Sequence, residues 1–524
     1  MRFARNSMYG AIAGASAAVG NLASAVIIAR LLGADGMGAV SYAVWLVLSI
    51  TPVIECGIPA AVSRYVPQMR GAGEDRAAEE LAARLMASLA RASVVAAVAA
   101  VILVVGMRYW GGASSHAEQV FRGLFGSIFY GMPMLLAAYA IVQSISAFSY
   151  AYLRGKQQFD TAAKLAAISV LVQLSGVVLG SIFYGAPGAV AGYAAGQIIP
   201  ALACAGLLWK STGVRTAIAP RVRRYSAFAW AANIANTFVW ARIEMFFLAF
   251  FWGEASVGLL AVALALANFA TQPPLLMTSG VLSLVAEQNG RGDRAGMQLA
   301  YSGGTTLLCA LVLPASFCMA AVMPVLLPLV YGQAFAPAVP AAALLVCVAG
   351  ISVAGSMATN LVYAAERSDF VFYASASGGV CAIAAGFALV PEWGLMGAAI
   401  GRALVQLSLV AAGTLFVWRR LGFHASIRSL ARIVVASAVA ALVAAATVLL
   451  VAAPLSLAVA LVLGSATYLY LLMALRAFSA SEFELMSKAV RALPRPFARV
   501  GERAVSLFAL GAAGMPSMGW LRGE

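Results

Sequence analysis

The chain is a succession of apolar runs of about twenty residues, each long enough to cross the hydrocarbon core of a bilayer as a helix. Short polar segments, many of them containing glycine, proline or arginine, separate these runs. The pattern predicts fourteen membrane-spanning helices, near residues 7–29, 37–60, 86–106, 123–147, 162–184, 189–209, 226–252, 255–277, 298–323, 338–362, 370–390, 394–417, 433–453 and 455–475. Pro187 and Pro391 mark the breaks where two pairs of helices meet at short turns.

The composition fits a membrane protein and excludes most other classes. Of the 524 residues, 63% are apolar and only 10% are charged, which leaves too few polar side chains to cover a soluble protein. A soluble enzyme, a nucleic-acid-binding domain, a secreted disulfide scaffold and a disordered chain are therefore excluded. An outer-membrane barrel is excluded because its strands alternate in polarity over about ten residues. The predicted fold class is an all-α polytopic membrane protein.

The basic residues predict how the helices are oriented. Cytoplasmic loops of membrane proteins carry an excess of lysine and arginine. With the N-terminus inside, 28 of the 34 basic residues fall in cytoplasmic segments, and the outside loops hold only Arg30, Arg108 and Arg122. This division predicts that both chain ends are cytoplasmic, and it explains the net charge of +15 without a nucleic-acid partner.

The sequence carries no pattern typical of metal or nucleotide chemistry. The six cysteines all fall in apolar segments without a C-x-x-C pair, and the two histidines, His116 and His424, are far apart. No G-x-x-x-x-G-K-[ST] motif is present, so we expect no ATP hydrolysis by this chain. We expect no cofactor and no covalent chemistry, and so predict that the protein is not an enzyme.

A weak internal repeat predicts the domain organisation. A shift of 220 residues aligns Gly33 with Gly253 and Gly38 with Gly258. Six predicted helices separate the copies, so the repeat is parallel, as in transporters that work by alternating access. We predict two six-helix bundles around a central cavity, followed by two extra helices. The predicted parts are an N-terminal lobe at 1–209, a cytoplasmic linker at 210–225, a C-terminal lobe at 226–417, the extra helices within 418–475 and a basic cytoplasmic tail at 476–524.

The seventh predicted helix carries the richest set of polar residues. Such groups are costly in a bilayer, about 3 kcal/mol for an arginine at the helix centre, and so indicate function or a buried partner. At 100° per residue, one face of the helix holds Asn233, Asn236 and Glu244. Arg242 lies on the opposite face, where it could hold a phosphate or form a structural ion pair, for example with Glu55.

Other polar residues within the spans are also candidates. Arg402 lies in the twelfth helix, and Arg91, in the third, could instead extend to the cytoplasmic headgroups. Glu55 and Glu244 are the only acidic residues well inside predicted spans, so either could carry a coupling proton or sodium ion. The remaining candidates could bind sugar hydroxyls or hold helices together; they are Asn21, Asn268 and Gln272.

The segment from Ala29 to Arg64, ARLLGADGMGAVSYAVWLVLSITPVIECGIPAAVSR, resembles the opening signature of the polysaccharide-biosynthesis flippase family. That family is part of the multidrug/oligosaccharidyl-lipid/polysaccharide exporter superfamily. The matching positions include Arg30, Gly33, Gly38 and Arg64. The segments YLRGKQQF (152–159) and RIEMFFLAFFWGEASVG (242–258) are also similar to parts of the family, although Glu244 stands where aspartate is commoner.

The resemblance implies a flippase in the bacterial inner membrane. It would move undecaprenyl-pyrophosphate-linked oligosaccharides from the cytoplasmic to the outer leaflet, with Arg242 and Arg402 on the pyrophosphate. A polysaccharide polymerase and chain-length machinery would be its protein partners. A multidrug/toxin extrusion-type exporter, which shares the fold, and a membrane glycan polymerase or ligase are the alternatives. The predicted basic cavity disfavours the first of these, and the short outside loops disfavour the second.

Overall fold

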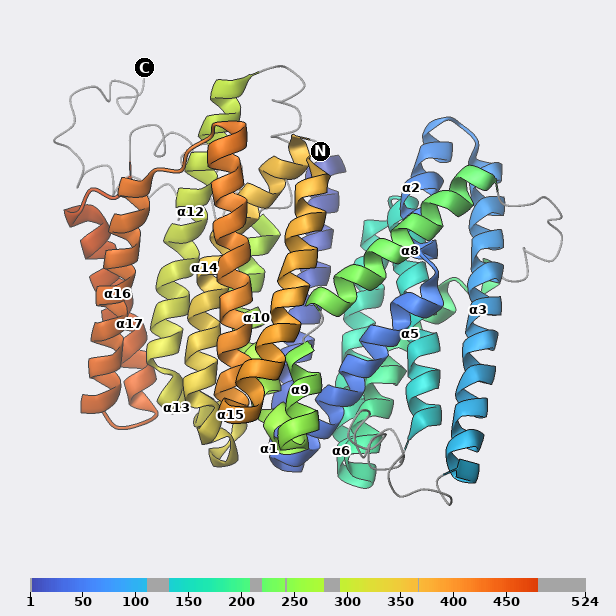
Figure 1. The fold of residues 1–524 in the computed structure, drawn as a ribbon, viewed down its shortest axis with the longest axis horizontal. Helices are drawn as coiled ribbons and strands as arrows, with labels where there is room; N and C mark the ends of the chain where they lie inside the picture. Colours follow the sequence, from blue (N-terminus) through green and yellow to red (C-terminus); the bar gives the residue numbers. More distant parts are fainter. Residues whose placement is uncertain are drawn as a thin grey trace. The chain divides into compact units, whose positions relative to one another are not determined.

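The computed structural model describes residues 2–110, 132–207, 219–240, 243–277, 293–365 and 367–478 (Figure 1). The described residues form helices joined by short turns and contain no strand. The helices of the first half are α1 (Arg2–Glu55), α2 (Ile58–Gly71), α3 (Asp75–Trp110), α5 (Pro133–Gly155), α6 (Phe159–Ala203), α8 (Pro220–Trp240), α9 (Ile243–Trp252) and α10 (Glu254–Met277). Those of the second half are α12 (Arg294–Ala321), α13 (Met323–Tyr331), η2 (Gln333–Ala338), α14 (Val339–Ala364), α15 (Ser368–Phe416), η3 (Val417–Leu421), α16 (Ile427–Leu450) and α17 (Leu455–Ala474).

The membrane-spanning character of the chain is confirmed. Within the described ranges, ten helical segments are long and apolar enough to cross a bilayer. Three of them contain two crossings, because α1, α6 and α15 reverse direction at Gly33, Gly185 and Gly394. Each of these glycines has a positive φ, which glycine adopts without steric cost. All fourteen predicted spans overlap described helices, and the protein is a multi-pass, all-helical membrane protein.

Several predicted boundaries are wrong, for local reasons. The second predicted span ends at Glu55, because Cys56 and Gly57 both adopt positive φ values and start the separate helix α2. Helix α3 begins at Asp75, well before the apolar run, since its charged first turns are themselves helical and pair Glu80 with Arg76 and Arg84. The hydrophobic pattern marks where a helix lies in the membrane rather than where it ends.

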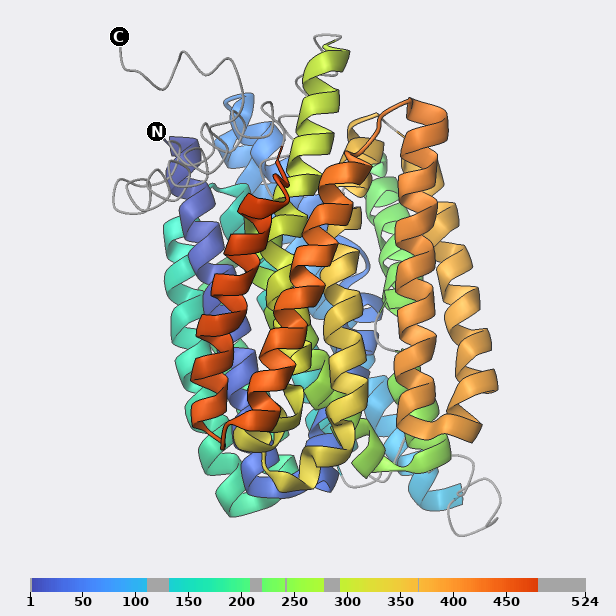
Figure 2. The same ribbon diagram turned by 90° about the vertical axis from the view of Figure 1, so that its left-hand side faces the viewer.

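The described helices fall into two compact units. The first contains residues 1–269, 330–341 and 375–402, and in it α1 packs along α5 and α6. The second contains residues 270–329, 342–374 and 403–524. Its helices α16 and α17 form an antiparallel pair against α12, as Figure 2 shows. The predicted division into lobes at 1–209 and 226–417, with the linker 210–225 and the parts 418–475 and 476–524, remains a prediction.

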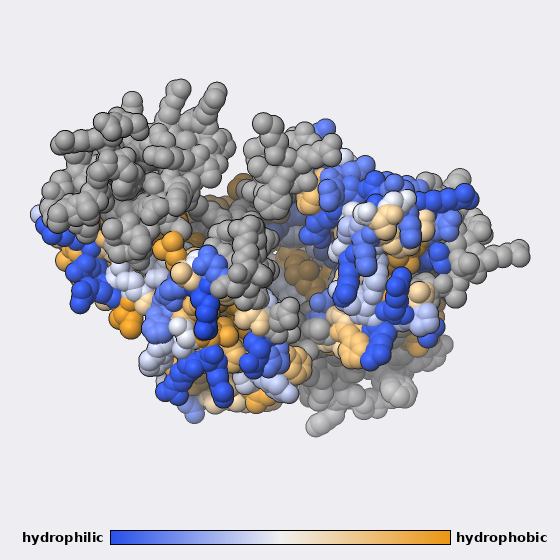
Figure 3. Space-filling model, turned by 90° about the horizontal axis from the view of Figure 1, so that it is seen from above, coloured by the Kyte–Doolittle hydropathy of each residue, from blue (hydrophilic) through white to orange (hydrophobic). Residues whose placement is uncertain are grey.

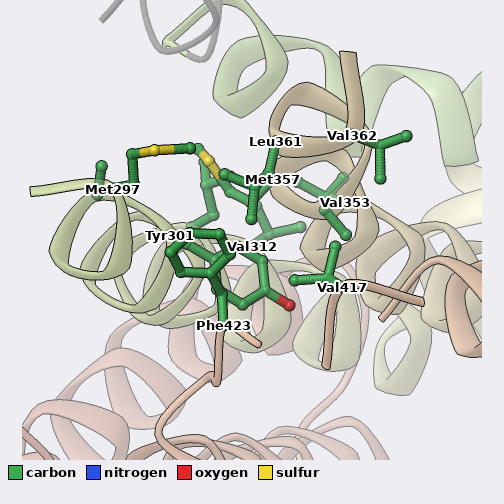
Figure 4. Packing of buried hydrophobic residues seen from close by; sticks show 12 residues of the cluster. Met297, Tyr301, Val312, Val353, Met357, Leu361, Val362, Val417 and Phe423 are labelled. Carbon is green, nitrogen blue, oxygen red and sulfur yellow. The ribbon is translucent and has the colours of Figure 1, made fainter. Parts of the chain in front are cut away.

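The second unit has a well-packed apolar core (Figure 4). Met297 and Tyr301 of α12 meet Met357 of α14. Val417, the first residue of η3, and Phe423, in the loop after η3, close this cluster. A second cluster joins α12 to α16 and α17, and Tyr468 there donates a 2.6 Å hydrogen bond to the Ala310 carbonyl.

In the first unit, the two copies of the repeat cross each other at the aligned glycines. A Cβ built on Gly38 of α1 would overlap the carbonyl of Glu254 and lie 3.0 Å from the nitrogen of Gly258. A Cβ on Gly258 of α10 would overlap the carbonyl of Ala34 and lie 2.8 Å from the nitrogen of Gly38. The contact is therefore reciprocal under the 220-residue shift, and it supports the predicted repeat.

The helix hairpins within α6 and α15 repeat a second contact. Gly188 and Gly397 each lie three residues after the turn glycine. A Cβ on Gly188 would overlap the backbone of Gly180, and one on Gly397 would overlap the carbonyl of Leu389. Small residues thus let the two arms of each hairpin approach closely.

Basic residues gather at one end of each unit. In the first unit, the Arg64 guanidinium lies 4.6 Å from the ring centre of Tyr225, and Lys156 pairs with Glu79 at 3.6 Å. These contacts join the α2–α3, α5–α6 and α8 ends, and Figure 3 looks onto this hydrophilic end. In the second unit, Arg294 donates to the Leu421 carbonyl at 3.1 Å. Predicted cytoplasmic segments thus meet within each unit.

Candidate functional site

A buried ion pair joins α9 to α15 in the first unit. Nη1 of Arg402 lies 3.2 Å from Oε1 and 3.3 Å from Oε2 of Glu244. The side chains are 16% and 10% exposed, respectively. Glu244 lies in the first turn of α9, where the helix dipole stabilises a negative charge. Both are predicted site residues, Arg402 as a ligand of the pyrophosphate and Glu244 as a coupling residue.

The Arg402 guanidinium uses only part of its bonding capacity in this pair. Arginine carries five N–H donors in a planar fork, and only Nη1 contacts Glu244. Among the residues that the structure describes, Nε and Nη2 of Arg402 have no hydrogen-bond partner. Two neighbouring donors on one edge of a guanidinium match two oxygens of a phosphate or carboxylate. The arrangement can therefore bind a second anion while Glu244 holds the first edge.

Aromatic contacts fix α9 against α15 around this pair. The Phe247 and Phe387 rings lie 4.9 Å apart in an edge-on arrangement. Nε1 of Trp252 donates a 2.8 Å hydrogen bond to the carbonyl of Val390, near the turn of α15. A Cβ on Gly386 would overlap the Phe247 ring, so glycine is what allows the ring to lie against α15. These contacts hold the Glu244 carboxylate in reach of Arg402.

The structure brings a second group of polar side chains together, in the N-terminal repeat. Nε2 of Gln173 in α6 donates to Oγ of Ser24 at 3.0 Å and to Oδ1 of Asn21 at 3.4 Å. Asn21 is a predicted site residue, whereas Gln173 was not predicted. The cost of a polar group in a span, which selected Asn21, applies equally to Gln173 and could have found it.

Of the other predicted site residues, Arg91, Glu55 and Asn233 contact neither group. Arg91 is exposed on α3, and its Nε donates to the Ala87 carbonyl at 3.4 Å. Glu55 is partly buried at the end of α1. Asn233 and Asn268 are exposed in α8 and α10. Two predicted residues lie in helices but have side chains outside the described residues, and one lies wholly outside them; these are Asn236, Gln272 and Arg242.

The residues of the opening motif have structural positions. Nε of Arg30 donates a 2.9 Å hydrogen bond to the carbonyl of Val330. Gly33 makes the turn in α1, and Gly38 makes the crossing of the two repeats. The Arg64 guanidinium lies over the rings of Tyr65 and Tyr225. The motif therefore belongs to the scaffold that carries the site.

Within the ranges that the structure describes, no group of three or more His, Cys, Asp or Glu side chains could hold a metal ion. The candidate site is thus an ion pair with spare donors and a neutral amide cluster. Its groups can bind and release a ligand, and they contain no activated nucleophile.

Comparison with known proteins finds one family that matches part of the chain. Residues 124–340 match the family described as "Polysaccharide biosynthesis protein", which confirms the resemblance found in the sequence. No curated protein matches the sequence.

Solved structures share the fold at low sequence identity. "Lipid II flippase MurJ, inward closed conformation" superposes with a TM-score of 0.67 at 13% identity, over 88% of this chain and 97% of that one. An inward-facing multidrug resistance MATE family transporter of the MOP superfamily superposes with a TM-score of 0.63 at 14% sequence identity, over 78% of this chain and 94% of that one. A MOP superfamily transporter from Pyrococcus furiosus superposes with a TM-score of 0.56 at 13% sequence identity, over 80% of this chain and 95% of that one. The fold is one of flippases and transporters.

Proposed function

We propose that this protein is a flippase that moves undecaprenyl-pyrophosphate-linked oligosaccharides from the cytoplasmic to the outer leaflet of a bacterial inner membrane, by alternating access. The observation that carries the proposal is the Arg402 guanidinium, which lies within a membrane-spanning segment and has two donor nitrogens without a partner among the described residues. The family match supports a glycan substrate, and the shared fold supports transport.

The chemistry of Arg402 favours an anionic substrate. An arginine in a span is costly, about 3 kcal/mol at the helix centre on insertion scales, and Glu244 offsets its charge only through one nitrogen. The pyrophosphate of a lipid-linked glycan carries paired oxygens that match the free edge of the guanidinium. Arg242, two residues before Glu244, remains the second predicted phosphate ligand.

The same ion pair supports a role for Glu244 in coupling. In the described conformation, its carboxylate holds Arg402. A substrate anion that drew Arg402 away would leave the carboxylate to take a proton or a sodium ion. Transport would then be coupled by exchange of partners on Arg402, with Glu55 as the other predicted coupling residue.

The experiment that tests the proposal measures the sidedness of the lipid-linked oligosaccharide. Cells that lack the protein are supplied with the parent chain or with Arg402→Gln, and an impermeant sugar-modifying reagent reports what has reached the outer leaflet. We expect Arg402→Gln to leave the oligosaccharide on the cytoplasmic side even when its amount in the membrane is matched to that of the parent. Arg76→Gln, at a fully exposed arginine, is the matched control and should export normally. Normal export by Arg402→Gln would refute the assigned site.

A multidrug exporter is the second candidate, because the MATE structures share the fold. Such a protein would protect cells from cationic drugs, and its loss would leave glycan sidedness unchanged. A glycan polymerase predicts a third outcome, in which short unpolymerised units reach the outer leaflet. The sidedness measurement therefore separates all three functions.

A further inference from the structure

We propose that Asn21, Ser24 and Gln173 form a neutral subsite that binds the sugar hydroxyls of the transported glycan, separate from the charged pair that binds its anionic group. The inference rests on the proposed function. It assigns the sugar and the phosphate of one substrate to different copies of the internal repeat.

The three side chains form one hydrogen-bonded unit between α1 and α6. The Gln173 amide nitrogen contacts both Ser24 Oγ, at 3.0 Å, and Asn21 Oδ1, at 3.4 Å. Gln173 is 6% exposed and Ser24 is fully buried, whereas Asn21 is exposed. The unit therefore runs from the packed interface of the two helices to an accessible side chain.

Glycines on both neighbouring helix segments allow close packing around the hydrogen-bonded unit. A Cβ on Gly196, in the second arm of α6, would lie 2.7 Å from Cβ of Gln173 and 3.0 Å from the Ser169 carbonyl. Beside Asn21, a Cβ on Gly20 would lie 2.5 Å from Cγ1 of Val170. Gln173 is thus held between α1 and the second arm of α6, and its amide is oriented before any ligand arrives.

The unit keeps one donor group and one acceptor free. Gln173 commits its amide nitrogen, and Asn21 commits its carbonyl. Among the described residues, Nδ2 of Asn21 and Oε1 of Gln173 have no hydrogen-bond partner. A neutral donor beside a neutral acceptor matches hydroxyl and amide groups, which both donate and accept. The two amides are uncharged, so they offer no electrostatic attraction to a phosphate.

The internal repeat relates this unit to the charged pair. The 220-residue shift that aligns Gly38 with Gly258 also aligns Ser24 with Glu244. At related positions of the first and seventh predicted helices, one copy therefore holds a neutral hydrogen-bonded cluster and the other a carboxylate–guanidinium pair. This asymmetry suits a substrate with a neutral sugar part and an anionic part.

The test compares two lipids on the purified full-length protein. The probes are undecaprenyl pyrophosphate and undecaprenyl-pyrophosphoryl-N-acetylglucosamine, and native mass spectrometry measures the affinity for each. We expect Asn21→Leu and Gln173→Leu to weaken binding of the sugar-bearing lipid about three- to tenfold, the loss of about one hydrogen bond. Their affinity for the lipid without sugar should not change. Asn21→Leu, at an exposed position, keeps the test informative if Gln173→Leu fails to fold.

Gln197→Leu is the matched control, since Gln197 also lies in α6 and accepts a 2.8 Å hydrogen bond from Ser146 of another helix. It should bind both lipids as the parent does. If the Gln173 and Gln197 variants both lose affinity equally for the two lipids, these amides only hold helices together, and the proposed subsite is overturned. If the parent binds neither lipid, the proposed function itself fails. If Arg402→Gln is the only variant that weakens binding, and it weakens binding of both lipids, the proposed function stands but the sugar subsite is rejected.

Discussion

The guanidinium of Arg402 and the carboxylate of Glu244 lie 3.2 Å apart, although 158 positions of the chain separate them. One residue belongs to the long kinked helix α15, and the other begins the short helix α9. The pair connects two helices of one unit, and within the described ranges Nε and Nη2 of the arginine have no other partner. It is at once a link between helices and a candidate ligand site.

The link can be measured by a double-mutant cycle. Breaking a buried ion pair on one side leaves an uncompensated charge, so Glu244→Gln alone should lower the free energy of unfolding by about 3 kcal/mol. Removing both charges in Glu244→Gln with Arg402→Gln should cost less than the two single changes added together. Chemical unfolding of the full-length protein in detergent checks this. Additive losses would show that the two side chains do not interact.

The crossing of Gly38 and Gly258 should tolerate no side chain. A methyl group at Gly38 would overlap backbone atoms, which cannot rotate away, so Gly38→Ala should destabilise the protein by roughly 1–3 kcal/mol. The effect appears as a lower midpoint of thermal unfolding. Gly206→Ala is the control, because no described residue lies within 4 Å of its Cβ position. A parent-like midpoint for Gly38→Ala would mean that the two repeats do not cross there.

Gly192 in the α6 hairpin and Gly401 in the α15 hairpin occupy matching positions, but substitution by alanine should affect stability differently at the two. A Cβ on Gly192 would overlap backbone atoms of Gly176 and Val177, whereas one on Gly401 would lie 3.2 Å from the Ala385 methyl group. Gly192→Ala should therefore destabilise the fold by about 1–3 kcal/mol. Gly401→Ala should stay within about 1 kcal/mol of the parent, because alanine also favours the helix. Thermal unfolding of the two variants side by side decides between this outcome and equal effects.

The predicted orientation can be tested with single cysteines. In a variant whose six free cysteines are replaced, Glu392→Cys beside the α15 turn should react with an impermeant maleimide in intact cells. Glu74→Cys, in the turn between α2 and α3, should react only after the cells are opened. Positive segments stay inside, and the α2–α3 turn lies among them. The reverse labelling pattern would invert the topology and with it the direction of the proposed transport.

Much of the fold follows from local properties of the sequence. Apolar runs of bilayer length locate the helices, and glycine and proline near residues 185–188 and 391–394 locate the turns. The turn residues are the glycines rather than the prolines, because only a positive φ reverses the chain there. The end of the second span at Glu55 was not predictable, since nothing in the apolar pattern marks the two successive left-handed residues that follow it.

The site was predictable as a set of residues but not as a set of contacts. The cost of polar groups in a bilayer selects Glu244, Arg402 and Asn21 from the sequence alone. Their partners depend on which helices pack together, and a single sequence does not contain that information. The pairing of Glu244 with Arg402 and of Asn21 with Gln173 therefore comes only from the structure.

The reciprocal crossing at Gly38 and Gly258 is, in geometric terms, an isologous interface inside one chain. Each copy presents the same two positions, and each receives the carbonyl four residues before the partner's glycine. A surface that meets its own copy in this way is what a twofold homodimer requires. A protein of half this length with the same crossing would already possess the surface on which to dimerise. Duplication and fusion of such a chain would then have allowed the two halves to acquire different residues, a charged pair in one and neutral amides in the other.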